Sequence, residues 1–204
     1  MKLLIATGNS GKLREFQELL GGLLEGGKHE LVSLKDVGID APEEPHETFH
    51  ENAAEKARHA AQKSGLWALA DDSGICVDAL NGGPGVRSAR FADTDEARRQ
   101  KLLQHLSSFP MSRRGAHFFC AAALSSPDGQ KLFRTEGRVD GRIATAARGD
   151  GGFGYDPLFI PAEIGTKTLA ELPQEEKNRL SHRGRALARM SPLLMKLLHE
   201  GKLD

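Results

Sequence analysis

Short apolar runs alternate with amphipathic segments along the first third of the chain. Lys2 to Ala6 and Glu30 to Leu34 are apolar runs typical of short strands, and the apolar residues from Leu13 to Leu24 recur at helical spacing. Glycine pairs at 21–22 and 26–27 weaken and then end this helix. A strand, a glycine-containing turn and an amphipathic helix together indicate the opening of an α/β unit.

The middle of the chain repeats this alternation. Thr48 and Glu51 form a capping-box pattern at the start of a helix that Gly65 closes. Trp67 to Ala70 predicts a buried strand that ends at the sequence Asp71-Asp72-Ser73-Gly74, and Ile75 to Leu80 is a further short apolar run. We therefore expect a second helix-to-strand connection whose strand ends in polar residues.

The second half predicts one more charged helix, a hairpin and a helical C-terminal third. The helix covers about Asp95 to Ser107, and the hairpin pairs Ala116–Leu124 with Gln130–Arg134 around a Pro-Asp-Gly turn. Leu158 to Ile160 predicts a strand, and the chain is helical from about Pro173, with a break or kink at Ser191-Pro192. Strands that alternate with helices early and a hairpin late favour an α/β fold with a mixed sheet.

Composition narrows the class of protein. The 204 residues carry 28 basic and 28 acidic side chains. This balance argues against a nucleic-acid-binding protein, since such proteins usually carry a basic excess. No apolar stretch approaches the roughly 18 residues that span a bilayer, and the N-terminus lacks the pattern of a signal peptide. The two cysteines, Cys76 and Cys120, both lie in apolar runs and are expected to be buried thiols. We therefore predict a cytoplasmic globular protein without a membrane segment.

The first candidate site is the turn Thr7-Gly8-Asn9-Ser10-Gly11-Lys12. Its glycines let backbone amides approach a phosphate, the following helix N-terminus favours an anion, and Lys12 could neutralise phosphate charge. It is not a Walker A loop, because Leu13 follows the lysine where Ser or Thr is required. A plain strand-to-helix turn with a solvated lysine explains the pattern equally well.

Carboxylates form the second candidate. Adjacent acids such as Asp71 and Asp72 usually bind a divalent ion or share a proton, and on a strand only one of the two would face the site. Glu43 and Glu44, in a proline-flanked loop, could add carboxylate ligands for Mg²⁺. The alternatives are a capping aspartate in a turn and solvated loop glutamates.

Two further segments have the composition of a ligand site. The sequence from Gly151 to Pro157 places three glycines beside Phe153 and Tyr155, as in a loop that wraps a flat ligand and stacks on a nucleobase. Lys177 and the segment Ser181-His182-Arg183-Gly184 could hold phosphates or hydrogen-bond a base. A tight turn with two anchoring aromatics and a solvated basic helix face remain the alternatives.

Taken together, these segments resemble the inosine/xanthosine triphosphate pyrophosphatase family, the Ham1-like hydrolases of non-canonical purine nucleotides. The resemblance rests on T-G-N-S-G-K, E-N-A-x-x-K-A, A-D-D-S-G, G-G-P-G-V-R-S-A-R, G-G-F-G-Y-D-P and S-H-R-G, which follow one another in the family's order from Thr7 to Gly184. It implies an elongated mixed β-sheet flanked by helices, two lobes with a central cleft, a single domain over residues 1–204 and a homodimer.

The resemblance also implies the activity: Mg²⁺-dependent hydrolysis of ITP, dITP and XTP to the monophosphate and pyrophosphate, which removes these nucleotides from the precursor pool. Asp72 would be metal ligand and proton acceptor, and Glu43 would complete the metal site, although Glu44 is not excluded. The residues that would bind substrate are Thr7, Gly8, Asn9, Ser10, Gly11, Lys12, Ser73, Phe153, Gly154, Tyr155, Asp156, Lys177, His182 and Arg183.

Two other functions remain open at this point. One is a Maf-like pyrophosphatase for other modified nucleotides, including pyrimidines. The other is a nucleotide-binding regulator without turnover, although a pure binder would gain little from carboxylates such as Glu43 and Asp72 near phosphates.

Overall fold

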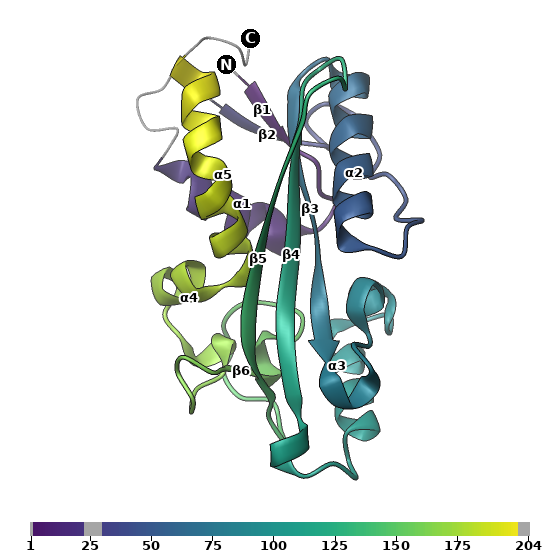
Figure 1. Cartoon of the computed structure of the whole chain (residues 1–204), viewed down its shortest axis with the longest axis vertical. Coiled ribbons are helices and arrows are strands. Elements are labelled where there is room, and N and C mark those ends of the chain that lie inside the picture. Colours follow the sequence, from purple (N-terminus) through teal and green to yellow (C-terminus); the bar gives the residue numbers. More distant parts are fainter. Residues whose placement is uncertain (1, 23–29, 200–204) are drawn as a thin grey trace. The chain divides into compact units, whose positions relative to one another are not determined.

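Six strands form one mixed sheet in the computed structural model, which describes residues 2–22 and 30–199. The strand order is β2-β1-β3-β4-β5-β6 (Figure 1). β1 pairs in parallel with both β2 and β3, whereas β5 and β6 are antiparallel. The strands are β1 (Lys2–Ile5), β2 (Glu30–Ser33), β3 (Trp67–Val77), β4 (Gly115–Ser125), β5 (Leu132–Ile143) and β6 (Phe159–Pro161).

Within the part of the chain that the structure describes, five α-helices accompany the sheet: α1 (Ser10–Gly21), α2 (Phe49–Ser64), α3 (Asp95–His105), α4 (Gln174–Leu180) and α5 (His182–His199). Thr48 caps α2 by accepting a hydrogen bond from the Glu51 amide at 3.2 Å, and Gly65 ends it in the left-handed conformation, as predicted. The prediction of an α/β fold with a mixed sheet flanked by helices is confirmed. The elongated form and the central cleft stay predictions.

The chain divides into two compact units. The first unit comprises Met1–Asp72, Cys120–Glu136 and Arg183–Asp204, and the second comprises Ser73–Phe119 and Gly137–His182. Strands β3, β4 and β5 each contribute residues to both units. Each unit has its own apolar core.

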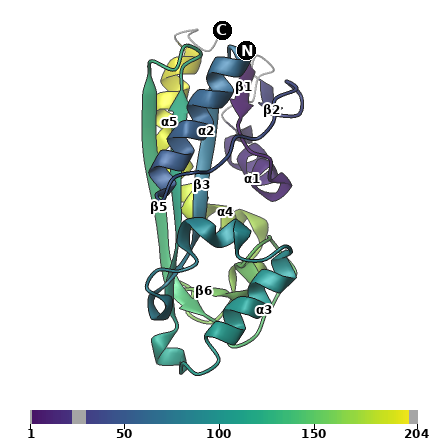
Figure 2. The same ribbon diagram turned by 90° about the vertical axis from the view of Figure 1, so that its right-hand side faces the viewer.

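In the first unit, helices cover both faces of the sheet. α2 and α5 lie on opposite sides of the strands (Figures 1 and 2). Leucines of α5 pack with Phe16 and Leu20 of α1 and with Trp67 and Leu69 of β3 in one buried cluster. α2 instead buries small residues, its alanines at 53, 54, 57, 60 and 61. Small side chains bring a helix backbone close to its neighbours, and this closeness lets Asn52 and Lys56, the two buried polar residues of α2, reach β3.

The second unit packs around α3, the ends of the long strands and the segment near β6. Its buried cluster includes Leu102, Phe118, Val139, Tyr155 and Phe159. The rings of Phe118 and Phe159 pack edge to face with centroids 4.8 Å apart. Of the two aromatic residues predicted to bind a ligand, Tyr155 belongs to this core, whereas Phe153 is only partly buried.

Strand β3 corrects one prediction. The sequence Asp71-Asp72-Ser73-Gly74 does not follow the strand but lies within it, since β3 continues to Val77. Two buried aspartates are tolerated in a strand only where each meets cations or hydrogen-bond donors, and both do so here, as described below. The prediction that the two side chains point to different faces is confirmed by their separate partners.

The C-terminal helices differ from the prediction of a helical segment from about Pro173 with a break or kink at Ser191-Pro192. α4 ends at Leu180 and Ser181 is extended, so Lys177 and Ser181 do not share a continuous helix. Pro192 lies inside α5 and does not end it, so the predicted break is absent, whereas the alternative of a kink stays a prediction. Apolar packing on both sides of the proline, by Met190 and Leu194, compensates for the backbone hydrogen bond that proline cannot donate.

Other boundaries also differ from expectation. α1 is described to Gly21, and the predicted continuation at 23–24 and the end at 26–27 fall outside the described residues. β5 extends to Ile143, far beyond the predicted Arg134, with charged residues on its exposed face. Of the two cysteines, both free, Cys120 is buried as predicted, whereas Cys76 is partly exposed.

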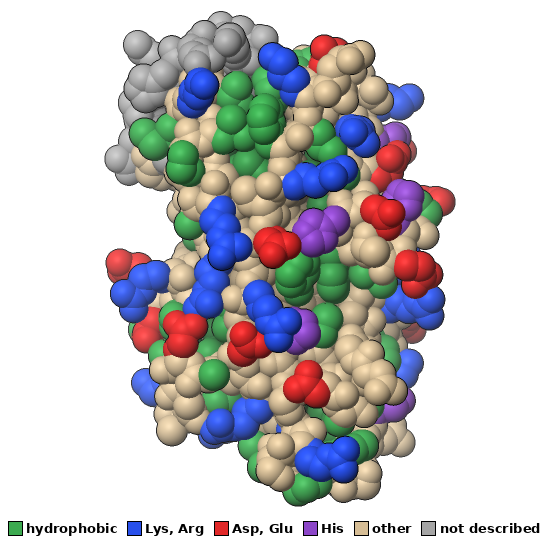
Figure 3. Space-filling model, in the orientation of Figure 1, with side chains coloured by type: hydrophobic (Ala, Val, Ile, Leu, Met, Phe, Trp, Pro, Cys, Tyr) green, Lys and Arg blue, Asp and Glu red, His purple; other side chains and the backbone are tan. Residues whose placement is uncertain are grey.

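The surface agrees with the balanced charge of the sequence. On the face shown in Figure 3, basic and acidic side chains are interspersed. Within residues 2–22 and 30–199, no helix is long and apolar enough to cross a bilayer.

Candidate active site

The turn after β1 has the local structure of an anion-binding loop. Asn9 caps α1 by accepting a hydrogen bond from the Lys12 amide at 3.0 Å, and the Thr7 hydroxyl accepts one from the Asn9 amide at 3.2 Å. A Cβ on Gly8 would stand 3.2 Å from the Cβ of Ala41, so the loop and the segment after β2 are in close contact. α1 therefore begins at Ser10, directly after the capping residue Asn9.

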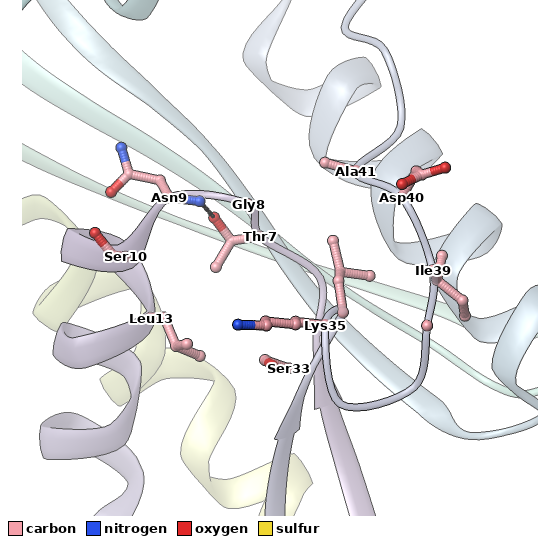
Figure 4. A pocket seen from close by; sticks show the side chains of 12 residues that line it. Thr7, Gly8, Asn9, Ser10, Leu13, Ser33, Lys35, Ile39, Asp40 and Ala41 are labelled. Carbon is pink, nitrogen blue, oxygen red and sulfur yellow. Dashed lines mark hydrogen bonds between the residues drawn. The ribbon is translucent and has the colours of Figure 1, made fainter.

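A pocket of about 540 Å³ opens beside this turn, between the start of α1 and residues 33–41 (Figure 4). Thr7, Asn9 and Ser10 line one side, and Lys35 extends across it toward Leu13. Lys12 does not line this pocket. Its ammonium group lies 3.2 Å from Asp71 Oδ2 instead. The turn residues predicted to bind substrate therefore border open space, and the lysine faces β3.

Asp72 sits among three polar groups on one face of β3. Its Oδ2 accepts a hydrogen bond from the Asn52 amide nitrogen at 3.0 Å, and its Oδ1 lies 3.3 Å from the Lys56 ammonium. The same ammonium is 2.7 Å from Glu44 Oε1. Asn52 and Lys56 are four residues apart on α2, on one face of the helix, and both are buried. A single cation thus lies between two carboxylates.

Burial governs the acidity of this group. It raises the pKa of Asp72, because the nearby ammonium of Lys56 does not fully offset the loss of solvent and Glu44 adds a further negative charge. Burial alone would lower the pKa of Lys56, but the carboxylates of Asp72, Asp71 and Glu44 outweigh it and raise that pKa. Asp72 is therefore a buried carboxylate that contacts one ammonium and one amide group and whose pKa lies above its usual range.

Asp71 has the opposite environment. Its Oδ2 accepts hydrogen bonds from Nε and Nη2 of Arg183 at 3.2 and 2.9 Å and also forms an ion pair with Lys12. Burial would raise the pKa of Asp71, yet the charges of Arg183 and Lys12 hold it well below its usual range. Arg183 is 1% exposed, so its guanidinium faces the interior, and its predicted contact with substrate stays a prediction.

The acidic residues fit Mg²⁺ only in part as they stand. Within the described residues, no three His, Cys, Asp or Glu side chains come together as a complete metal cage. Mg²⁺, however, is commonly held by one or two carboxylates together with water and substrate phosphates. Asp72 supplies such a carboxylate, and Glu43 is exposed in the loop that precedes α2. The donor set fits a cation that arrives with a phosphorylated ligand.

In the second unit, the predicted base-binding loop is held by a lysine and an aspartate. Asp156 Oδ2 accepts a hydrogen bond from the Phe153 amide at 3.0 Å and lies 2.8 Å from the Lys177 ammonium. That ammonium also stands 5.3 Å from the centre of the Phe153 ring. A Cβ on Gly152 would collide with the Asp156 carboxylate, and its φ of +72° is left-handed, so this close approach requires glycine.

Neighbouring contacts fix the rest of this loop. The Gly154 amide donates to Asp95 at 2.8 Å, and Arg99 of the same helix donates to the Gly154 carbonyl at 2.9 Å. The Tyr155 hydroxyl donates to the Ser88 carbonyl at 3.0 Å, and burial raises the pKa of that hydroxyl. Tyr155 is therefore an anchor of the loop. Phe153, which is only partly buried, is the aromatic residue with ring surface left for a ligand.

His182 and Ser73 are the remaining predicted residues of this unit. The His182 ring stacks on Phe118, with centroids 4.6 Å apart and planes within 5°. Ser73 is partly buried, directly after Asp72 on β3.

The sequence analysis missed several residues that the structure places at these sites. Asn52 and Lys56 belong to a motif that the resemblance used but for which no role was assigned. Two polar residues four apart in an alanine-rich helix were the available signal. Glu15, Asp95 and Arg99 gave no such signal, because each looks like an ordinary charged helix residue.

Together, the fold and the first unit's site define an α/β protein with a candidate phosphate-binding turn and a buried carboxylate on the neighbouring strand. The sequence profile of the Ham1 family matches residues 3–193, and the chain belongs to this family.

Similar proteins agree over nearly the full length. The dITP/XTP pyrophosphatase of Geobacter sulfurreducens is 52% identical over 192 residues, covering 92% of this chain and 93% of that protein. A HAM1 protein from Coxiella burnetii superposes with a TM-score of 0.83 at 42% identity, covering 96% of this chain and 99% of that structure. A nucleoside-triphosphatase, dITP/XTP pyrophosphatase, from Mycobacterium abscessus gives a TM-score of 0.72 at 48% identity, over 93% and 98% of the two chains.

Proposed function

We propose that the protein hydrolyses non-canonical purine nucleoside triphosphates, namely ITP, dITP and XTP, to the monophosphate and pyrophosphate. The observation that carries this proposal is the geometry around Asp72, a buried carboxylate on β3 that contacts Asn52 and Lys56 of α2. β3 pairs with β1, the strand that leads into the phosphate-binding turn. Relatives about half identical to this chain bear the name dITP/XTP pyrophosphatase, which supports the same substrate class.

Charge decides how the triphosphate would be held. It carries about four negative charges at neutral pH, and a site must match them with cations. The turn Thr7–Gly11 offers backbone amides at a helix N-terminus, and Lys12 and Lys56 offer ammonium groups. We assign these residues to the phosphates and assign Phe153, Asp156, Lys177, His182 and Ser73 to the remainder of the nucleotide.

Asp72 and Glu43 are the proposed Mg²⁺ ligands. When bound, Mg²⁺ would lower the pKa of a water molecule and neutralise phosphate charge. Asp72 accepts a proton or orients the attacking water, and a carboxylate that also binds the metal does more of the second than the first. Glu44 is already paired with Lys56 at 2.7 Å and serves to hold that lysine.

In the proposed reaction, water attacks the α-phosphorus. The bond from this phosphorus to the bridging oxygen breaks, and pyrophosphate leaves with the electron pair. The nucleophile's proton passes to Asp72 or to solvent.

Base selectivity would follow from unpaired donors. A site whose donors match a 6-oxo group leaves them unsatisfied when the 6-amino group of adenine enters, and a buried unsatisfied donor is costly. Lys177 is the donor that we assign to this role, since the amides of Phe153 and Gly154 already donate to Asp156 and Asp95. The Phe153 ring is the stacking surface.

We further propose a homodimer that acts in the cytoplasm on free nucleotides, with residues 1–204 as one functional domain and no role in binding nucleic acid or membranes. Size-exclusion chromatography with light scattering tests the dimer, for which a mass near 44 kDa is twice the chain's 22.1 kDa.

A substrate panel tests the activity. ITP, XTP, dITP, GTP, ATP and dUTP are incubated with and without Mg²⁺, and pyrophosphate and orthophosphate are quantified for each. We expect Mg²⁺-dependent pyrophosphate release from ITP, dITP and XTP, with ATP nearly inert. Orthophosphate as first product would contradict attack at the α-phosphorus, preference for dUTP would favour a Maf-like enzyme, and binding without turnover would favour a regulator.

A further inference from the structure

Four charged side chains make a continuous series of contacts inside the first unit. Glu15 forms an ion pair with Nη1 of Arg183, and Arg183 donates hydrogen bonds to Asp71 through Nε and Nη2. Asp71 Oδ2 also lies 3.2 Å from the Lys12 ammonium. Glu15, Asp71 and Arg183 are each no more than 4% exposed. Glu15 is the member of this series to which neither the sequence motifs nor the proposed reaction gives a role.

The series is balanced, with two acids and two bases. Charges this deeply buried persist only when paired, and removing one partner leaves the others uncompensated. The guanidinium of Arg183 also stands 6.0 Å from the centre of the Phe16 ring, which adds a further contact to its cation. The position of Arg183 is thus determined from three sides.

Asp71 divides one oxygen between two cations. Arg183 and Lys12 both contact Oδ2, whereas Oδ1 of Asp71 is buried without a hydrogen-bond partner among the described residues. A stronger interaction of Arg183 with Oδ2 therefore weakens the ion pair between Asp71 and Lys12. Glu15 contacts Nη1 of Arg183, so its negative charge offsets part of the positive charge that Arg183 directs at Asp71.

The contacts of Lys12 and Glu15 also connect α1 to β3. Lys12 and Glu15 stand three residues apart on that helix, so the helix is tied to β3 once directly and once through Arg183. The Lys12 side chain retains 14% exposure, so it is held from the inside and open on its outer side. A lysine held in this way meets a phosphate with little loss of side-chain freedom.

We propose that Glu15 is a positioning residue for the phosphate-binding Lys12 and acts on it through Arg183 and Asp71. The proposal rests on the proposed function for the identity of the ligand, a nucleoside triphosphate, but the placement of Lys12 can be tested without turnover. In this proposal, Glu15 itself contacts neither substrate nor metal.

The first test measures Lys12 in the ligand-free protein. Trace acetylation with acetic anhydride, followed by mass spectrometry of the peptide, gives the modification rate of each lysine. In Glu15→Gln, which keeps the side-chain shape, Lys12 is released from Asp71 and we expect its rate to rise about threefold, as the loss of part of a charge-assisted contact implies. Lys63, an exposed lysine of the same unit, is the internal reference.

The second test is a double-mutant cycle in steady-state kinetics with ITP. We expect Glu15→Gln to raise KM about fivefold, with a smaller change in kcat, and to have no further effect on KM in a Lys12→Ala background. A purely structural role predicts equal effects in both backgrounds. Glu18→Gln, an exposed acid on the same helix, is the matched control and should leave KM unchanged.

Folding is checked by thermal melting of every variant. If Glu15→Gln does not fold, Glu15→Asp keeps the charge and should show the same changes in reduced size. An unchanged labelling rate at Lys12, or an additive effect on KM, overturns the proposal. Wild-type protein without turnover overturns the proposed function instead, and the labelling comparison then still decides the role of Glu15.

Discussion

Neighbouring residues on the two faces of β3 carry the same carboxyl group in opposite environments. Asp71 is surrounded by cations that hold its pKa far below the usual range, whereas burial dominates at Asp72 and raises its pKa. Two cations, Arg183 and Lys12, contact the carboxylate of Asp71, whereas one cation, Lys56, contacts that of Asp72. The strand's alternation alone makes this division possible.

The difference separates stability from chemistry. A charge that is fully matched inside the protein has nothing to offer a ligand, and its removal harms the fold. A charge that is poorly matched costs stability but can bind a cation or a water molecule, as functional sites commonly require. Asp71 thus belongs to the framework of the first unit and Asp72 to its proposed reaction.

The largest expected effect is the loss of turnover in Asp72→Asn. We expect kcat for ITP to fall by about 1,000-fold or more, because a carboxylate that binds metal and orients water is replaced by a neutral amide. The free energy of unfolding should change by no more than about 1 kcal/mol, since Asn can keep the contact with Asn52. Initial rates and urea denaturation measure the two quantities, and near-wild-type activity would contradict the assignment.

Asp71→Asn should show the reverse pattern. It leaves Arg183 and Lys12 with one acid between them, and we expect the free energy of unfolding to fall by about 3 kcal/mol. Activity per folded molecule should fall less than in Asp72→Asn. Equal stability of the two variants would remove the distinction between the two faces of β3.

The loop glutamates refine the metal site. Glu43→Gln should raise the Mg²⁺ concentration for half-maximal activity about tenfold, because one carboxylate ligand is lost. Glu44→Gln is the matched variant and should chiefly alter KM through Lys56, to which Glu44 is paired. Titrating Mg²⁺ against both variants decides between them, and the opposite ranking would assign the metal to Glu44.

The smallest effect is on the pH dependence of stability, measured on metal-free protein. The raised pKa of Asp72 means that the native state binds this proton more readily than the unfolded state, so its contribution to stability declines as pH rises through that pKa. The lowered pKa of Asp71 gives a contribution that is present above the ordinary value of 3.8 and is lost in more acidic solution.

Paired denaturation curves detect this contrast. Between about pH 4 and pH 7, the stability difference between wild type and Asp71→Asn should stay constant. Over the same interval, the difference between wild type and Asp72→Asn should move against wild type as pH rises. Parallel behaviour of the two differences would contradict the opposite pKa shifts.

Much of the fold was predictable because hydrophobic periodicity survives wherever one face is buried. The strand at Lys2, the helix from Thr48 to Gly65 and the hairpin near Pro127 follow from such patterns and their turn residues. β5 escaped detection beyond Arg134 because its exposed face is charged and its glycines conceal the alternation. β3 was cut short at Asp71 because the cations that permit aspartates within a strand come from distant parts of the sequence.

The candidate site was predictable in type but not in its network. Glycine-rich turns and paired acids indicate phosphate and metal chemistry from local sequence. The contacts of Asp72 with α2 and of Asp71 with Arg183 join residues 16 to 112 positions apart, and no local pattern specifies them. Long-range pairing of charges therefore separates framework residues from proposed ligand-binding residues only once the fold is known.

Hydrolysis of ITP in water enriched in ¹⁸O tests the central claim most directly. Attack at the α-phosphorus places the label in the monophosphate, and mass spectrometry should find one ¹⁸O atom in IMP and none in pyrophosphate. Label in pyrophosphate or in orthophosphate would mean attack at the β- or γ-phosphorus and would contradict the proposed pyrophosphatase.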